Sequence, residues 1–290
     1  MTPLKERRVS TRGATILIFF LLLILHPLPI RGESQEPVPI VAADRFPEAF
    51  LNQDFWYDIS FLWFSKAAEG HFYFEKGEEP SEYRAVLDAE TKGFIGWLSS
   101  YRRQRYVSVM DLVSTDKGRM LRTKYFSQEI RKGDQSEIVE SFIDYTNLTI
   151  TTRESNPGEK TAVSVETIPK DIIYHDFLSA YYNFRGGVFG VKKKGDIFKV
   201  DTLPRKGVSH IDVTIADEET EKGRKIDMED AHFLVRLDLD KRLFGQKDGE
   251  VWVWADKDFV PVMGEVRHIS FFGDVRGYRK SGRDVRQPQK

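Results

Sequence analysis

Short segments in which apolar and polar positions alternate recur along the chain from residue 55 to residue 278. In the first, "FWYDISFLWFS" (55–65), the apolar side chains at every second position would share one face of an extended strand. Aromatic and β-branched residues dominate these segments and turn-forming residues separate them, which is typical of antiparallel hairpins. The pattern predicts strands at 55–65, 70–77, 82–90, 106–113, 119–130, 137–145, 148–152, 196–203, 209–216, 231–239, 250–256 and 261–278.

Few segments have helical periodicity. Residues 94–103 are expected to form a short amphipathic helix, and residues 176–185 a second one. Residues 132–134 and 156–158 are typical of hairpin turns, and the charged stretch 217–230 is interpreted as a hairpin loop. Strands do not alternate with helices, so a parallel sheet is not expected. The fold class predicted is mainly β: a strongly curved antiparallel sheet or half-barrel with a few short helices packed on it.

The stretch "DIIYHDFLSAYYNFRGGVFG" (171–190) places chemically active side chains close together. His175, Asp176 and Ser179 are the residue types of nucleophilic hydrolysis, but no G-x-S-x-G sequence surrounds the serine. On a helix, His175 and Ser179 would be neighbours four residues apart, but Asp176 would point away from His175. The alternative is a structural helix with Asp176 as its N-cap, accepting from the amides of Leu178 or Ser179, and with a glycine ending it. We favour this helix, which leaves no catalytic residue assigned.

Aromatic residues on the expected strands and helix are the candidate ligand contacts. Trp252 and Trp254 alternate with valines, so both indoles would share one face of the strand, and Asp256 would continue that face as a polar rim. A curved sheet with apolar faces can hold an acyl chain, an apolar segment of another protein or its own helix. Ordinary core packing is the alternative for these aromatics. The candidate ligand-binding residues are Trp63, Tyr181, Trp252 and Trp254.

The first 32 residues have the organisation of a secretory signal peptide: a basic start, the apolar run "ATILIFFLLLIL" (14–25), then prolines and small residues. The run is shorter than the roughly 18–20 residues of a membrane span. Cleavage near Gly32 would place the protein in the periplasm or cell envelope with no membrane span, whereas an uncleaved anchor would hold it at the inner membrane. Residues 33–50 are expected to form a linker, 51–280 a single β-rich domain, and 281–290 a basic, disordered tail.

The composition narrows the chemistry. The chain has no cysteine, so disulfides and a lipid-modified N-terminal cysteine are excluded. Its net charge of −1 gives no basic footprint for nucleic acid. The six histidines form no H-x-x-x-H or H-E-x-x-H pair, and no glycine-rich nucleotide loop is present. We therefore expect no metal site, no cofactor and no enzymatic activity.

The sequence resembles a bacterial envelope family known as domain of unknown function 3108. The segment 176–185 is similar to the family signature D-x-L-S-x-x-Y-x-x-R, 249–278 resembles its closing strands, and 55–74 resembles its opening strand pair. The resemblance covers residues 50–280 and implies export and a curved sheet like that of the lipoprotein carriers, with helices on its concave face. It implies no catalytic residues. The motif positions are Asp176, Leu178, Ser179, Tyr182, Arg185, Asp256 and Pro261.

These expectations together predict a non-enzymatic binding or carrier module of the cell envelope. Its partner would be an apolar ligand, a lipid or another envelope protein. A structural or assembly partner without a small-molecule ligand is the alternative, and a hydrolase is the third candidate.

Overall fold

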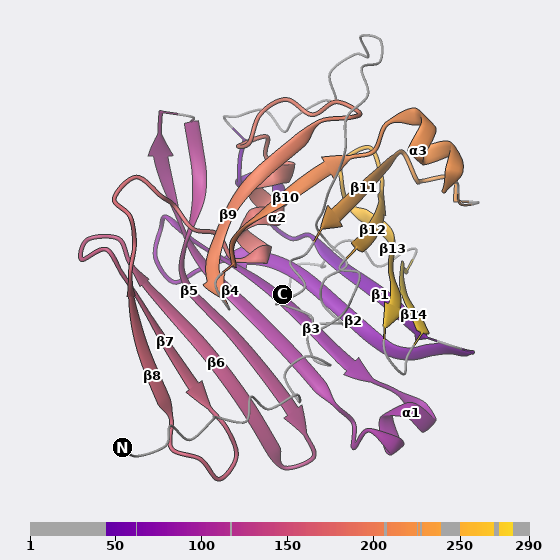
Figure 1. The fold of residues 1–290 in the computed structure, drawn as a ribbon, viewed down its shortest axis with the longest axis horizontal. Helices are drawn as coiled ribbons and strands as arrows, with labels where there is room; N and C mark the ends of the chain where they lie inside the picture. The colour runs from indigo at the N-terminus through magenta and orange to yellow at the C-terminus, as the bar shows by residue number, and fades with distance from the viewer. Residues whose placement is uncertain are drawn as a thin grey trace, which may run out of the picture.

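In the computed structural model, fourteen strands form one antiparallel sheet (Figure 1). The structure describes residues 45–280 except 62, 117, 206–207, 225, 227, 239–249 and 270–272. Within these residues, four short helices accompany the sheet: η3 (Glu48–Phe50), α1 (Gly93–Leu98), α2 (Phe177–Arg185) and α3 (Glu218–Gly223). The strands are β1 (Asp54–Phe61), β2 (Phe64–Lys76), β3 (Glu82–Thr91), β4 (Arg103–Thr115), β5 (Gly118–Lys132), β6 (Gln135–Asp144), β7 (Thr149–Ser155), β8 (Ala162–Thr167), β9 (Ile197–Arg205), β10 (Val208–Ile215), β11 (Phe233–Asp238), β12 (Glu250–Ala255), β13 (Pro261–Ile269) and β14 (Gly273–Arg279).

The order of the strands explains why the sheet is open. It runs from β8 back to β1, then from β14 back to β9, and the two series join where Tyr57 of β1 faces Arg279 of β14. The two edges, β8 and β9, are therefore consecutive in the chain. The segment between them, 168–196, carries α2, which lies between the two arms of the curved sheet (Figure 1). The predicted mainly β, strongly curved antiparallel sheet with few helices is confirmed.

Helix α2 is part of the core. Eight of its nine residues are buried. Ala180 and Phe184 pack mainly against β9–β14, whereas Leu178, Tyr181 and Tyr182 pack mainly against β1–β5. The helix thus gives both arms of the sheet an apolar surface to bury, which a sheet of this curvature cannot supply by itself.

A buried carboxylate fixes the start of α2. Asp176 is the N-cap, and its Oδ1 accepts hydrogen bonds from the amides of Leu178 at 2.8 Å and Ser179 at 3.1 Å, as the sequence predicted. Its Oδ2 accepts from Ser108 Oγ in β4 at 2.6 Å and from Thr123 Oγ1 in β5 at 2.7 Å. Burial raises the pKa of Asp176, and these four donors oppose the rise. The cap therefore also attaches the helix to the sheet.

Asn183 makes a second attachment, about two helical turns after Asp176. Its Oδ1 accepts from the backbone N–H of Leu121 at 2.9 Å, and its Nδ2 donates to the Leu121 carbonyl at 2.7 Å. These backbone groups lie beyond the end of the β5–β6 ladder, which begins at Tyr125 and Phe142. The side-chain amide of Asn183 thus takes the place of a neighbouring strand as hydrogen-bond partner of the buried N–H and C=O groups of Leu121.

His175 lies at the opposite edge of this polar cluster. Asn183 Nδ2 is 3.3 Å from its Nδ1, so Nδ1 is the acceptor and the neutral ring carries its proton on Nε2. Its backbone bonds to Asp201 and Leu203, so the chain before α2 runs beside β9. Burial lowers the pKa of His175 from 6.5 to about 4.

Three local predictions were wrong. The segment 261–278 is not one strand, because β13 and β14 lie within it and pair antiparallel. The segment 55–65 is not one strand: β1 ends at Phe61, the chain turns, and β2 begins at Phe64 and runs through residues 66–70, which the sequence had suggested as a separator. The stretch 217–230 is not only a loop, because Asp217 accepts from the amide of Thr220 and caps α3. The turns at 132–134 and 156–158 and the helix within 94–103 are confirmed. The signal peptide, most of the linker and the basic tail lie outside the described residues.

We expect Asp176→Ala to lower the free energy of unfolding by about 3 kcal/mol or more. A lost exposed cap costs roughly 0.5–2 kcal/mol, but here Ser108 and Thr123 would also be left as buried donors without their acceptor. Ser179→Ala removes one hydroxyl that bonds to Thr123 and to the Asp176 carbonyl, and should cost only about 1 kcal/mol. Urea unfolding followed by circular dichroism measures both. Equal losses for the two variants would contradict the structural role of the carboxylate.

The free energy of unfolding should fall as the pH drops from about 6.5 to about 4. In this range His175 binds a proton in the unfolded chain but stays neutral in the folded one, so acid favours the unfolded state. At about 1.4 kcal/mol per pKa unit, the lowered pKa of His175 accounts for a loss of up to about 3 kcal/mol in the free energy of unfolding. His175→Gln keeps a polar group beside Asn183 and removes the titration. The raised pKa of Asp176 acts in the opposite direction in both proteins and cancels in their difference. The free energies of unfolding of the wild type and of His175→Gln, measured across this pH range, should converge at low pH. A difference that stays constant with pH would disprove the lowered pKa of His175.

Candidate functional site

The C-terminal half of α2 borders a small apolar cavity on the concave side of the sheet. Its volume is about 30 Å³, which admits one or two water molecules but no acyl chain unless side chains move. The walls come from α2, from strands β9–β12 and from the turn between β12 and β13. The lining residues are Ala180, Tyr181, Phe184, Val200, Val213, Val235, Val253, Ala255, Phe259 and Pro261.

Tyr181 brings a polar atom to this apolar lining. Its hydroxyl is buried and has no hydrogen-bond partner among the described residues. Burial raises the pKa of Tyr181 to about 12, so at neutral pH the hydroxyl is protonated and can donate. A buried donor without an acceptor costs about 1–3 kcal/mol. The hydroxyl is therefore a donor that lacks an acceptor among the described residues, on a side chain that lines the cavity.

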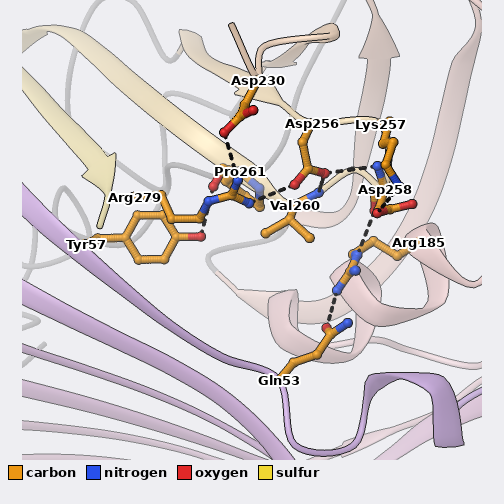
Figure 2. A network of polar contacts seen from close by, with 10 residues as sticks. All are labelled: Gln53, Tyr57, Arg185, Asp230, Asp256, Lys257, Asp258, Val260, Pro261 and Arg279. Carbon is orange, nitrogen blue, oxygen red and sulfur yellow. Dashed lines mark hydrogen bonds and ion pairs between the residues drawn. The ribbon is translucent and has the colours of Figure 1, made fainter. Parts of the chain in front are cut away.

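Arg185 and Lys192 place two positive charges beside the cavity. Their exposed fractions are only 4% and 1%. Arg185 Nε donates to the Asp258 carbonyl at 3.0 Å and its Nη1 to Gln53 Oε1 at 2.7 Å (Figure 2). Among the described residues, neither cation forms an ion pair with a carboxylate. Such burial is rare for charged side chains, because desolvation of a charge is expensive.

The surroundings of Lys192 are aromatic. Its Nζ lies 5.3 Å from the ring centre of Phe184 and 5.1 Å from that of Phe259, and both rings also line the cavity. It donates to the carbonyl of Arg185, the last residue of α2, where the helix dipole favours a cation. Burial, and to a smaller extent the charge of Arg185, lower the pKa of Lys192 from 10.5 to about 8. The amine is thus mostly charged at neutral pH.

The turn between β12 and β13 holds the other wall of the site. Asp256 Oδ1 accepts from the amides of Asp258 and Val260, both at 2.9 Å, and its Oδ2 accepts from Arg279 at 2.7 Å (Figure 2). The turn directs the Asp258 carbonyl at Arg185 and brings Phe259 against the helix. Two of the three segments that carried the family resemblance, 176–185 and 249–278, therefore meet at this site.

The structure places the seven motif residues in structural roles around α2. Leu178 and Tyr182 are fully buried core residues, Asp176 and Ser179 bond to the sheet, and Arg185 ties the helix to the β12–β13 turn. Pro261 begins β13, and its carbonyl accepts from the Tyr57 hydroxyl at 3.1 Å. Asp256 was expected to form a polar rim on the tryptophan face, but its contacts show that it organises the turn instead.

The four predicted ligand-binding residues are not brought together. Trp252 and Trp254 share one face of β12, as predicted, but they pack in a separate cluster with Leu234, Met263 and the segment around α3. The face of β12 on the concave side of the sheet is formed by Val251 and Val253, which alternate with the two tryptophans. Trp63 lies beyond the end of β1 and is 80% exposed. Of the four, Tyr181 lines the cavity.

The hydrolase residues do not form a nucleophile and base. Ser179 Oγ bonds to Thr123 Oγ1 and to the Asp176 carbonyl, while His175 faces Asn183, and all of these side chains are buried. No group of three or more His, Asp or Glu side chains within the described part of the chain is placed to hold a metal ion.

Sequence reasoning missed Lys192 and Phe259 as site residues. Lys192 begins a run of three lysines, which is typical of a solvated surface, and nothing local distinguishes it from Lys193. Phe259 follows the charged stretch 256–258 and adopts a left-handed backbone with φ of 56°, which the tight turn requires. Only the packing of the turn on α2 makes them neighbours.

Comparison with known proteins agrees with the motif analysis. Residues 57–279 match the family model described as "Protein of unknown function (DUF3108)". No curated protein matches the sequence. Among solved structures, the chain is similar to the "Crystal Structure of Beta-barrel-like Protein of Domain of Unknown Function DUF1849 from Brucella abortus", with 11% identity, a TM-score of 0.41, and coverage of 82% of this chain and 99% of that one. No helix among the described residues is long and apolar enough to cross a membrane. Because the family model matches most of the length of the chain, the chain belongs to the DUF3108 family of proteins of unknown function.

Proposed function

We propose that the protein is a non-enzymatic binding module whose ligand is an amphiphile with an anionic head group. The apolar part would lie against the concave wall beside α2, and the head group would face Arg185 and Lys192. The observation that carries this proposal is the pair of buried cations next to an apolar cavity, with no carboxylate paired to either among the described residues.

The energetics favour an anion at this place. Among the described residues, the Lys192 ammonium donates to a single carbonyl. A buried ammonium with so few partners is costly to the fold, and a ligand carboxylate or phosphate would supply the missing negative charge. The Tyr181 hydroxyl offers a further donor at the cavity. Strongly perturbed groups beside an apolar pocket are candidates for a binding site on general grounds.

The apolar part of the ligand has a matching surface. Val200, Val213, Val235 and Val253 come from four neighbouring strands and form an aliphatic wall. Since the cavity holds only about 30 Å³, binding requires Phe184 and Phe259 to move away from this wall. Both rings belong to segments outside the sheet, α2 and the β12–β13 turn, and can be displaced without breaking a strand pair.

A second candidate, an assembly partner in the envelope, is supported by the edge strand β8. All six of its residues are exposed, including Val163 and Val165. A free edge with apolar side chains can pair with a strand of another protein. We place this candidate second because the edge shows no feature that selects a partner.

Lys192→Met tests the ligand site. We expect it to weaken binding of a fluorescent fatty acid by tenfold or more, because the head group loses its counter-charge, while stability is unchanged or higher, since methionine fills the space without a buried charge. Lys193→Met, an exposed neighbour, is the matched control and should bind like the wild type. Fluorescence titration and thermal unfolding give both numbers.

The corresponding neutral fatty alcohol separates the head group from the tail. It should bind more weakly than the acid to the wild type and equally to wild type and Lys192→Met. Absence of binding by either probe at tens of micromolar, together with a large loss of stability in Lys192→Met, would refute the ligand site and leave the assembly role.

Export is part of the proposal and rests on the N-terminal pattern. The basic residues before residue 14, the apolar run 14–25 and the small residues that follow support cleavage near Gly32 and a place in the periplasm or envelope. N-terminal sequencing of the protein recovered from cells should give a start near residue 33. A start at Met1 in the membrane fraction would instead establish an uncleaved anchor.

A further inference from the structure

Five large apolar side chains are exposed together at one end of the sheet, where β1 turns into β2 and α1 connects β3 to β4. We call them the aromatic patch. Their exposed fractions lie between 56% and 80%, whereas most aromatic side chains of the sheet are buried. The patch consists of Trp63, Phe94, Trp97, Leu98 and Tyr101.

Ring contacts join three members of the patch, Trp63, Phe94 and Trp97, into one surface. The half-buried Phe64 links the two segments, because its ring centre lies 5.5 Å from that of Trp63 and 6.4 Å from that of Phe94. Phe94 in turn lies 5.9 Å from Trp97. Contiguous exposed apolar surface of this kind marks an interaction site more often than scattered residues do.

The patch is held in place by the fold. Ile95 packs against the main core cluster, so the opposite side of α1 must face outward. The backbone amide of Tyr101 bonds to the Gly96 carbonyl at 2.6 Å, and Ser99 Oγ lies 2.8 Å from Thr91 Oγ1 at the end of β3. These bonds fix the aromatic side chains at the tip of the molecule, where α1 projects from the sheet (Figure 1).

Three arginines lie directly beside the patch. Arg103, Arg105 and Arg131, with Glu129, line a surface hollow of about 90 Å³ on β4 and β5. Arg103 is two residues from Tyr101, and the turn after Arg131 reaches the patch through the Gly133 N–H, which donates to the Ser100 carbonyl at 3.1 Å. The hollow and the patch therefore belong to one end of the molecule.

The charge of this end differs from that of the whole chain. The segments 63–66, 88–105 and 129–134 carry seven basic and four acidic side chains. One of the basic side chains, Lys66, pairs with Asp58 outside these segments at 3.5 Å, which leaves a net charge of +2, whereas the chain as a whole carries −1. Asp88 pairs with Arg103 and Arg105, and Glu129 with Arg131, so the hollow itself keeps one positive charge in excess. The surroundings of the patch are thus complementary to an anionic surface.

We propose that the aromatic patch docks the protein onto a lipid bilayer that contains anionic phospholipids. Tryptophan and tyrosine prefer the boundary between head groups and acyl chains, and arginine forms paired hydrogen bonds with phosphate. A projecting tip of aromatic residues with a basic flank matches a bilayer surface, while a groove would be expected for a peptide. This docking surface is independent of the ligand site beside α2.

Vesicle sedimentation tests the proposal, with vesicles of phosphatidylcholine alone and of phosphatidylcholine with phosphatidylglycerol. The protein is purified as cells produce it and its N-terminus is determined, so that residues 14–25 contribute equally to every variant if they are retained. Wild type should bind the mixed vesicles better than the neutral ones. The double variant Trp63→Ser, Trp97→Ser should lose about tenfold or more of its partitioning to both.

Two further variants separate the contribution of the basic flank to vesicle binding from that of exposed apolar side chains in general. Arg131→Gln should lower binding to the mixed vesicles alone, by about fivefold, and added salt should reduce this difference. Val163→Ser with Val165→Ser removes comparably exposed apolar side chains from the edge strand β8 and should bind like the wild type. Thermal unfolding confirms that each variant is folded.

Three results would overturn the docking surface. One is the absence of vesicle binding by the wild type, and another is wild-type binding by the tryptophan double variant. The third is a wild-type dimer in analytical ultracentrifugation that the tryptophan substitutions dissociate, without vesicle binding, which would assign the patch to a second copy of the chain. None of these results bears on fatty-acid binding at Lys192.

Discussion

The rest of the structure depends on the hydrogen bonds that Asp176 forms with Ser108 and Thr123. An open sheet whose two edges are consecutive in the chain needs a crossing segment, and that segment must bring its own polar groups into the core. Buried polar groups are tolerated when each has a partner. The carboxylate meets this condition by capping α2 and accepting from β4 and β5 at once, so the helix has one position along the sheet. Asn183 makes the same kind of attachment to β5 about two turns later.

The two ends of α2 differ in the balance of their charges. At the N-terminal end, four donors surround one carboxylate. At the C-terminal end, Arg185 and Lys192 are satisfied by carbonyls, an amide oxygen and aromatic rings, and among the described residues by no carboxylate. The helix dipole offsets part of the cost, but not the whole cost of burying an ammonium. This imbalance, beside an aliphatic wall, is the physical basis of the proposed anionic ligand.

Aromatic residues serve three different surfaces of the molecule. Phe50, Phe72 and Phe74 pack around Tyr182 on the concave side. Trp252 and Trp254 cover the other face of β12 beneath the segment of α3, with the Arg224 guanidinium 3.8 Å from the Trp252 ring. Trp63 and Trp97 are left exposed at the tip. The high aromatic content, 13% of the chain, therefore does not by itself indicate a ligand pocket. The position of each ring decides its role.

The sequence by itself determined most of the strands, the helices α1 and α2, the cap at Asp176 and the family, because each follows from a local period or from a few neighbouring residues. It also determined that Trp252 and Trp254 share a face. It missed the edge strand β8 and the helix α3. It did not determine which face α2 covers, because both faces of β12 are apolar and a period of two does not distinguish them. The end of β1 was missed because aromatic residues continue through the turn to Phe64. Lys192 looked like a surface lysine, and only the tertiary structure buried it, since its neighbours Phe184 and Phe259 come from segments far apart in the chain whose meeting depends on the packing of α2 against the β12–β13 turn.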